Sequence, residues 1–296
     1  MEPYSRAAFP LRQAVCLGLA QGPAELLPVS SSAHITLIGW LAGWSYPDLD
    51  AELRKDFEVA LHAGTAAALV IGARRWRAAP AGTRKRQRPA PPPAATLPAD
   101  RRGALVLGLA LAPPALAGLV LESRIERLGT PPRIAGGLLA GALALALADL
   151  GGSGARRASD AGPLDGLLLG LAQTAALVPG ISRNGATLAV SRARGFGRPA
   201  ADELSRDCGL PVILGAVGLR GLRWVRVRSA RGFAAERSAA GSRIAAGGAA
   251  AFVSTLAARR LLERRDRPVS LLVCAAYRTA LAGVVLARLR RAQAGG

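Results

Sequence analysis

Two short polar stretches, each containing a proline, carry the residues of this 296-residue chain that could do chemistry. The first, PVSSSAH, holds the hydroxyl of Ser31 and the imidazole of His34, and the carboxyl group of Glu25 lies about one turn before it. The second, PGISRNG, contributes the guanidinium of Arg183. An imidazole three residues along a helix can activate a hydroxyl, and a guanidinium binds phosphate oxygens through two parallel hydrogen bonds. This set predicts nucleophilic attack on a bound phosphate or diphosphate.

Each stretch also marks the start of a helix, which is where an anion binds favourably. The first backbone N–H groups of a helix have no partner within it, and its dipole is positive at that end. Serine and asparagine are common there because their side-chain oxygens accept an N–H bond. The candidates for this position at the two breaks are Ser30, Ser31, Ser32, Ser182 and Asn184. If the two tips meet, two helix N-termini and Arg183 converge on one anion.

Each break taken alone has a simpler interpretation. Proline and serine can kink a membrane helix, with the serine bonded to its own backbone. Glu25 would then extend toward water, His34 would lie at the membrane interface, and Arg183 would be one more loop cation. However, a charged group at the centre of a membrane helix costs ~2.5–3.5 kcal/mol on insertion scales, so it is seldom retained without a function. We therefore favour a site at the tips, and we interpret His62 as a packed or hydrogen-bonded residue that could also line it.

The composition indicates a helical membrane protein. Hydrophobic residues make up 51% of the chain but aromatic residues only 4%, and 35 glycines allow helices to approach closely. The net charge is +20, and the cations cluster between apolar runs, as in the loops of multispanning proteins, so we exclude nucleic acid as a partner. The three cysteines lie far apart, which predicts neither a zinc site nor a disulfide framework.

The apolar runs predict six membrane spans and two re-entrant hairpins. A span needs roughly 20 mostly apolar residues. The predicted spans are at about 57–73, 103–121, 134–150, 207–225, 243–262 and 269–289. Residues 11–44 and 164–196 each break at a polar tip, so each is predicted to fold as two half-length helices. Such irregular backbone survives in a membrane only where it is buried in protein or lines a wet cavity.

The two hairpins resemble each other in sequence. Leu17–Gln21 (LGLAQ) recurs as Leu169–Gln173, and each copy is followed by a proline and then by serine. The chain therefore divides into two halves, about 1–150 and about 160–296, each a hairpin followed by three spans. Because three is odd, the second half enters the membrane from the opposite face. We predict a single all-α polytopic membrane domain over residues 1–296, built as an inverted repeat.

The charge of the loops predicts an orientation. Segment 74–102 is a Pro-rich loop with nine Lys or Arg residues and one Asp, which the positive-inside rule places in the cytoplasm. Both chain ends then lie outside. The basic segment 226–242 would also lie outside, against the rule, and we give the longer loop more weight.

The two tip motifs resemble those of a known protein family. QGPAELLPVSSSAH and PGISRNGAT are similar to the two signatures of bacterial undecaprenyl-diphosphatases, the bacitracin-resistance type of membrane phosphatase. The matching positions are Gln21, Glu25, Pro28, Ser30, Ser31, His34, Pro179, Gly180, Ser182, Arg183 and Gly185. Weaker similarities occur at Phe57–Val59, at Glu203–Ser205 through Pro211, and at Tyr277–Arg278.

The resemblance implies removal of the terminal phosphate from undecaprenyl diphosphate, which recycles the lipid carrier of cell-wall synthesis. It implies an inner-membrane protein whose site faces the outer side, which uses Mg²⁺ or Ca²⁺ and contacts membrane lipids, and it leaves a homodimer open. Ser31 would be the nucleophile, with Glu25 and His34 orienting or activating it and Arg183 holding the diphosphate. The residues expected to contact substrate are Gln21, Ser30, Ser32, Ser182, Asn184 and Gly185, and those expected near the metal are Glu25 and Gln21.

Three features depart from the family pattern. Gln21 is the uncharged option at its position, so a two-carboxylate metal site is not available there. Arg206 and Asp207 replace residues that are usually apolar, and the loop at 74–102 is longer than expected.

The rival function is a polyprenyl-phosphate transporter or flippase, because broken helices that meet at mid-membrane are typical of transporters. The pairing of Ser31 with His34 favours the enzyme, since transport needs no nucleophile.

Overall fold

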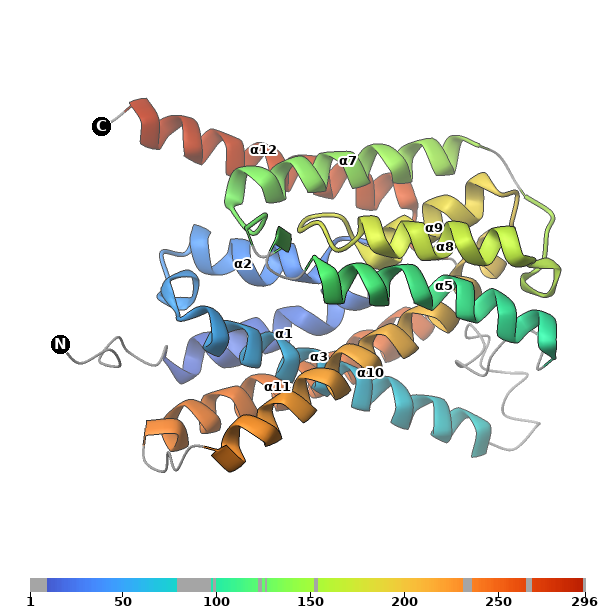
Figure 1. The fold of residues 1–296 in the computed structure, drawn as a ribbon. Coiled ribbons are helices and arrows are strands. Elements are labelled where there is room, and N and C mark those ends of the chain that lie inside the picture. Colours follow the sequence, from blue (N-terminus) through green and yellow to red (C-terminus); the bar gives the residue numbers. More distant parts are fainter. Residues whose placement is uncertain are drawn as a thin grey trace.

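The computed structural model describes residues 10–78, 97, 100–121, 124–125, 127–151, 154–230, 236–264 and 268–294. The regular structure of this part of the chain is helical, as the composition predicted (Figure 1). The helices are α1 (Leu11–Leu26), α2 (Ser31–Leu41), α3 (Ala51–Ala78), α5 (Arg101–Val120), α7 (Pro131–Leu150), α8 (Pro163–Ala175), α9 (Arg183–Ala193), α10 (Arg198–Ala230), α11 (Glu236–Glu263) and α12 (Leu271–Ala294). Two 3-10 turns lie at Tyr46–Asp48 and Ala158–Asp160.

Among the described residues, three helices are long and apolar enough to cross a membrane: α5, α7 and α12. They coincide with the predicted spans at 103–121, 134–150 and 269–289. The other predicted spans lie in α3, α10 and α11. These helices are longer, but charged and small residues interrupt their apolar stretches.

The charged borders of the predicted spans are themselves helical. Helix α10 begins at Arg198, so Arg206 and Asp207 lie inside it, and the Asp207 carboxylate accepts a hydrogen bond from the backbone N–H of Leu97 at 3.2 Å. Helix α3 continues to Ala78, into the predicted loop at 74–102. Most of the rest of that loop lies outside the described residues.

Both predicted hairpins are present as pairs of short helices. Helix α1 ends at Leu26 and α2 begins at Ser31, while α8 ends at Ala175 and α9 begins at Arg183. In Figure 1 the first pair extends inward from one end of the molecule and the second pair from the other, so that the two turns meet near the middle. The breaks therefore fall where the polar tips were predicted, and they place both tips at one location.

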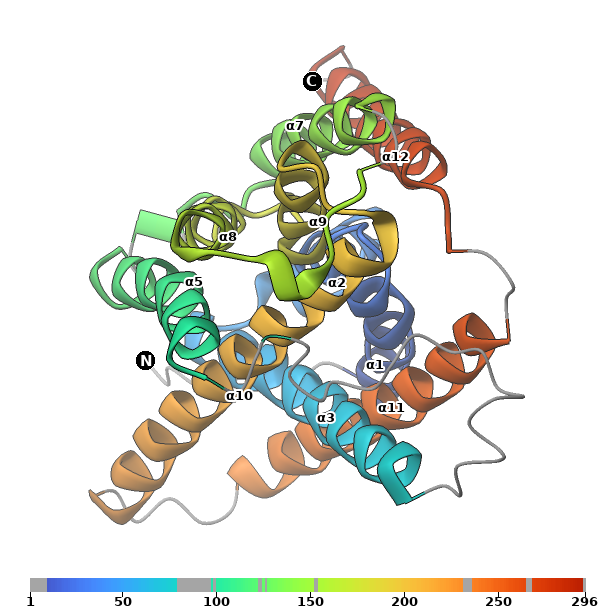
Figure 2. The same ribbon diagram turned by 90° about the vertical axis from the view of Figure 1, so that its right-hand side faces the viewer.

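Each hairpin packs its first helix against a long helix of the other half of the chain. Helix α1 lies against α11 and helix α8 against α5, while α7 and α12 lie side by side (Figure 2). Glycines permit both close approaches, because a Cβ on Gly18 would lie 2.3 Å from the carbonyl oxygen of Gly247 and one on Gly170 would lie 2.4 Å from that of Leu109. Gly18 and Gly170 are the matching glycines of the two LGLAQ copies.

We expect Gly18→Ala to destabilise the fold. The added methyl group would meet backbone, which cannot turn aside, so α1 and α11 must separate at a cost of about 1–3 kcal/mol. The thermal unfolding midpoint in detergent measures this. Gly136→Ala on α7 is the matched control, because its Cβ would meet nothing within 4 Å and alanine favours helix by up to about 1 kcal/mol. Equal midpoints for the two variants would contradict the packing argument.

Candidate active site

The first tip has an unusual backbone where α2 begins. Ser30 has φ 75° and ψ 93°, and it is the one non-glycine residue with positive φ in the described part of the chain. It immediately precedes Ser31, the first residue of α2, whose side chain is largely buried. Ser30 occupies the predicted capping position, but its side chain makes no capping bond and instead lies 3.4 Å from the hydroxyl of the exposed Ser32.

The second tip is capped by its serine, as predicted. The Ser182 hydroxyl oxygen accepts a hydrogen bond from the backbone N–H of Gly185 at 3.1 Å, so α9 begins at Arg183. The turn before it uses Gly180 at φ 97°, a conformation that favours glycine. Ser182 and Gly185 are thus both buried parts of the helix start rather than side chains extended toward a ligand.

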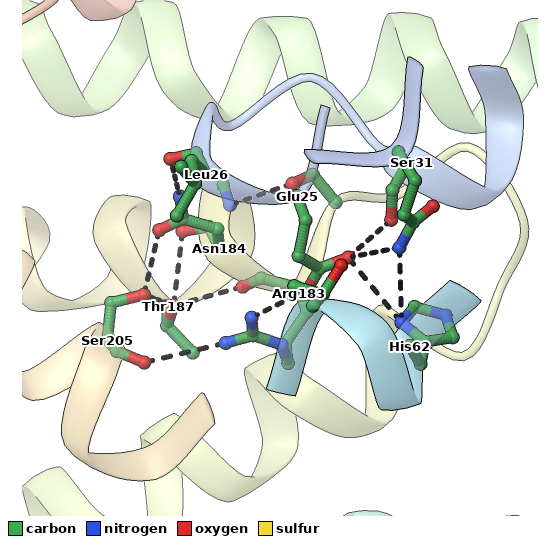
Figure 3. Close-up of polar contacts among 12 residues, drawn as sticks. Glu25, Leu26, Ser31, His62, Arg183, Asn184, Thr187 and Ser205 are labelled. Atoms are coloured by element: carbon green, nitrogen blue, oxygen red, sulfur yellow. Dashed lines mark hydrogen bonds and ion pairs between the residues drawn. The ribbon is translucent and has the colours of Figure 1, made fainter. Parts of the chain in front are cut away.

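The carboxylate of Glu25 is the centre of the polar cluster (Figure 3). Its Oε2 accepts a 2.6 Å hydrogen bond from the Ser31 hydroxyl, and its Oε1 accepts one at 3.0 Å from Arg183 Nη2. The amide nitrogen of Gln21 lies 3.4 Å from Oε2 and 3.3 Å from Nδ1 of His62. A carboxylate whose side chain is only 8% exposed is therefore paired with a cation and bonded to a hydroxyl. The structure brings together three of the four predicted catalytic residues, and it adds His62.

Arg183 is held in place by α10. Its second nitrogen, Nη1, lies 3.5 Å from the Ser205 carbonyl oxygen, and a Cβ on Gly209 would lie 1.9 Å from that nitrogen. Gly209 thus leaves the space that the guanidinium occupies. The Arg183 side chain is 21% exposed, so it is largely enclosed but can be reached by a ligand.

Asn184 joins the two tips to each other. Its amide nitrogen donates to the carbonyl oxygen of Leu26 at 3.0 Å, and its amide oxygen accepts from the Ser205 hydroxyl at 2.8 Å. The Ser205 hydroxyl also lies 2.6 Å from that of Thr187 (Figure 3). Asn184 was predicted to contact substrate, and the structure instead uses both ends of its amide in this link.

A buried arginine that the sequence analysis did not place in the site also joins the tips. Arg278, on α12, is 0% exposed and donates to the carbonyl oxygen of Pro28 in the first tip at 3.1 Å and to that of Gly180 in the second at 2.8 Å. It also donates to Leu138 at 3.2 Å and Gly137 at 3.3 Å, both on α7. The sequence does contain a sign of this residue, because an arginine inside an apolar run is as costly to bury in a membrane as the carboxylate of Glu25.

The expected pairing of Ser31 with His34 is wrong. Nδ1 of His34 lies 2.7 Å from the Ser30 carbonyl oxygen, and Nε2 lies 2.6 Å from the Tyr277 hydroxyl. Both ring nitrogens therefore bond elsewhere, while the Ser31 hydroxyl donates to Glu25. The i, i+3 spacing does place Ser31 and His34 on one side of α2, but the imidazole turns back onto the preceding turn.

The donors around Glu25 fit a metal ion only in combination with a substrate. The described residues contain no group of three His, Cys, Asp or Glu side chains that could hold a metal. Glu25 has hard oxygen ligands to offer, but Gln21 would add its amide oxygen only after turning its amide over, because its nitrogen faces Glu25 Oε2. Mg²⁺ is commonly bound by one or two carboxylates together with substrate phosphates. An all-protein cage of six to eight oxygens, as Ca²⁺ often has, is not formed by these residues.

Comparison with known proteins agrees with the family resemblance of the two tip motifs. Residues 14–284 match the family described as bacitracin resistance protein BacA. An undecaprenyl-diphosphatase of Anaeromyxobacter dehalogenans (strain 2CP-C) is 40% identical over 224 residues, which cover 75% of this chain and 73% of that protein. Undecaprenyl-diphosphatases of Desulforudis audaxviator (38% over 208 residues, 69% and 73% coverage) and Thermomicrobium roseum (37% over 230 residues, 72% and 77% coverage) are similar to it as well. This chain belongs to the bacitracin resistance protein BacA family.

Proposed function

We propose that this chain is a membrane phosphatase that converts undecaprenyl diphosphate and water into undecaprenyl phosphate and inorganic phosphate. Its relatives are undecaprenyl-diphosphatases, and the family is named for bacitracin resistance. The observation that carries the proposal is the Ser31–Glu25–Arg183 arrangement, in which one carboxylate bonds both a hydroxyl and a guanidinium. A hydroxyl bonded to a base, with a cation bonded to the same base, suits phosphoryl transfer.

In the first step the Ser31 oxygen attacks the terminal phosphorus. The new Oγ–P bond forms as the bond from phosphorus to the bridging oxygen breaks, and the lipid monophosphate leaves. The Ser31 proton passes to Glu25 Oε2, to which it is already bonded at 2.6 Å. Water then attacks the phosphoserine, the Oγ–P bond breaks, and inorganic phosphate is released as a proton returns to the hydroxyl. Direct attack by a water molecule activated at Glu25 is the alternative route to the same products.

Arg183 and the two helix N-termini balance the charge of the diphosphate. Arg183 is bound to Glu25 through one nitrogen, and its planar fork can turn toward phosphate oxygens. That movement would leave Glu25 a stronger base, since it would lose its cation. The first N–H groups of α2 and α9 have no partners within their own helices, and both helices begin at this point.

A divalent cation, Mg²⁺ or Ca²⁺, would be held by Glu25, by oxygens of the diphosphate itself and, once the Gln21 amide has turned its oxygen toward Glu25, by that oxygen. When bound, it would neutralise negative charge on the phosphoryl oxygens. Because Gln21 is uncharged, the protein supplies one carboxylate, and the substrate must supply the remaining anionic ligands. This favours Mg²⁺ over Ca²⁺.

For the fold, the proposal includes the six-span inverted repeat over 1–150 and 160–296. The packing between the two halves supports it. Helix α1 of the first half packs on α11 of the second, and α8 of the second half packs on α5 of the first, in each case through the matching glycine of the LGLAQ repeat. We propose, as the resemblance to the family implies, that the site faces the outer side of the inner membrane, with the basic loop at 74–102 in the cytoplasm. The homodimer remains a prediction.

Phosphate release from a C55 polyprenyl diphosphate by the purified chain in detergent micelles tests this function. We expect turnover that requires Mg²⁺ or Ca²⁺. The matching test for a transporter is movement of a labelled polyprenyl phosphate between leaflets of vesicles that contain the protein. A folded chain that moves lipid but releases no phosphate with any divalent cation would replace the enzyme with the transporter.

A further inference from the structure

The backbone just before the proposed nucleophile is in a conformation that serine rarely adopts. Ser30 has φ 75°, in the left-handed region, and every other described residue with positive φ is a glycine. Outside glycine this conformation costs free energy and persists only where the surroundings fix it. Since Ser31 follows directly, the orientation of the Ser30 peptide determines where the Ser31 hydroxyl lies relative to Glu25.

The Ser30 carbonyl oxygen accepts a hydrogen bond from the backbone N–H of His34 at 3.2 Å, and the shorter bond to it comes from the His34 side chain. A carbonyl oxygen can only accept a hydrogen bond, so Nδ1 of His34, 2.7 Å away, must carry the proton and donate it. In the neutral imidazole Nε2 then has a lone pair and accepts from the Tyr277 hydroxyl at 2.6 Å. The two rings are also stacked, with centroids 5.5 Å apart and planes 10° from parallel. The Ser30 carbonyl thus sets the tautomer of His34, and Tyr277 satisfies its second nitrogen and fixes the orientation of its ring.

We propose that Tyr277 and His34 form a positioning relay, which holds Ser30 in its left-handed conformation and so aims Ser31 at Glu25 and the bound phosphate. Tyr277 acts through His34, and His34 acts through the Ser30 carbonyl. Neither gives a proton to the reaction or takes one from it, since the Ser31 hydroxyl is bonded to Glu25 and both His34 nitrogens are engaged. The relay rests on the proposed function, because it positions the nucleophile of that reaction.

A relay and a proton carrier respond differently to a change at residue 30. If His34 only stabilises the conformation of Ser30, replacing Ser30 by glycine removes much of the need for it, because glycine adopts positive φ freely. If His34 carries a proton, glycine at residue 30 cannot replace it. Ser30→Ala is the matched control, because it also deletes the hydroxyl but keeps the strained Cβ.

The test is phosphate release from C55 polyprenyl diphosphate by wild type, Tyr277→Phe, His34→Ala, and the doubles of His34→Ala with Ser30→Gly and Ser30→Ala. We expect kcat to fall about tenfold in Tyr277→Phe and about a hundredfold in His34→Ala, with KM within about twofold, as for a displaced reacting group. Ser30→Gly is expected to restore about tenfold in the His34→Ala background, and Ser30→Ala to restore nothing. Thr279→Val, which removes a hydroxyl bonded only within α12, is expected to behave as wild type.

The outcomes separate this inference from the function on which it rests. Wild-type turnover with no more recovery from Ser30→Gly than from Ser30→Ala would overturn the relay and make His34 a proton carrier. Full activity in a folded Tyr277→Phe would remove Tyr277 from the relay. A folded wild type that releases no phosphate would overturn the proposed function itself. Unfolding midpoints of all variants distinguish loss of positioning from loss of fold.

Discussion

Arg183→Ala is expected to lower kcat/KM for phosphate release by about a thousandfold, as for the loss of a group that stabilises charge in the transition state. Two effects combine. The diphosphate loses its guanidinium, and Glu25, whose side chain is 8% exposed, keeps a buried negative charge without the cation 3.0 Å away. That charge also repels an incoming diphosphate. Phosphate release measured at several substrate concentrations separates weaker binding from slower chemistry.

Two further variants test whether the position of the guanidinium matters. Arg183→Lys keeps the charge but not the planar fork, so we expect a loss of about ten- to a hundredfold. Arg198→Ala removes an arginine that pairs with Asp202 one turn along α10, and its activity is expected to match wild type. If Arg183→Ala kept more than a tenth of wild-type activity, the diphosphate would have to bind elsewhere.

Arg278→Leu is expected to have the largest effect on stability. It leaves the carbonyl oxygens of Pro28 and Gly180 without their buried donor, whereas those of Gly137 and Leu138 lie inside α7 and keep their helix hydrogen bonds. Each unpaired buried carbonyl costs about 1–3 kcal/mol, so the loss for the two is about 2–6 kcal/mol. Because these two carbonyls belong to different tips, activity is expected to disappear wherever the fold survives. The measurements are the unfolding midpoint in detergent and the fraction that elutes as a single species.

Arg290→Leu is the matched control for Arg278, since it makes the same change at an exposed residue near the end of α12. It is expected to unfold at the wild-type temperature. Arg278→Lys is expected to recover part of the stability, because an ammonium can reach some of the four carbonyls. An Arg278→Leu protein that unfolds with the wild type and retains turnover would show that the tips do not need this link.

Much of this arrangement could be predicted from the sequence, for a physical reason. A carboxylate, an arginine and a row of hydroxyls are expensive inside apolar runs, so Glu25, Ser31 and Arg183 were identified by their surroundings alone. The two LGLAQ copies likewise marked matching helices, and both hairpins broke at the predicted residues. The all-helical fold followed from the abundance of Ala, Leu and Gly.

The partners of side chains were harder to predict. Spacing placed His34 beside Ser31, but which way an imidazole turns depends on the Ser30 carbonyl and on Tyr277, a residue 243 positions away from it in the chain. Arg278 bonds only to backbone oxygens, which every residue has, so no sequence pattern names its partners. Asn184 was assigned to the substrate because its type suits an anion, whereas tertiary packing gave its amide to Leu26 and Ser205.

The most direct test of the proposed mechanism is phosphate release by Ser31→Ala under conditions in which wild type turns over. Ser45→Ala is the control, because its hydroxyl bonds to Gln13, outside the Glu25 cluster. We predict that Ser31→Ala releases no phosphate above background while it unfolds with the wild type, and that Ser45→Ala remains active. Wild-type rates in a folded Ser31→Ala protein would rule out Ser31 as the nucleophile, because the terminal phosphate would then be attacked by something other than this hydroxyl.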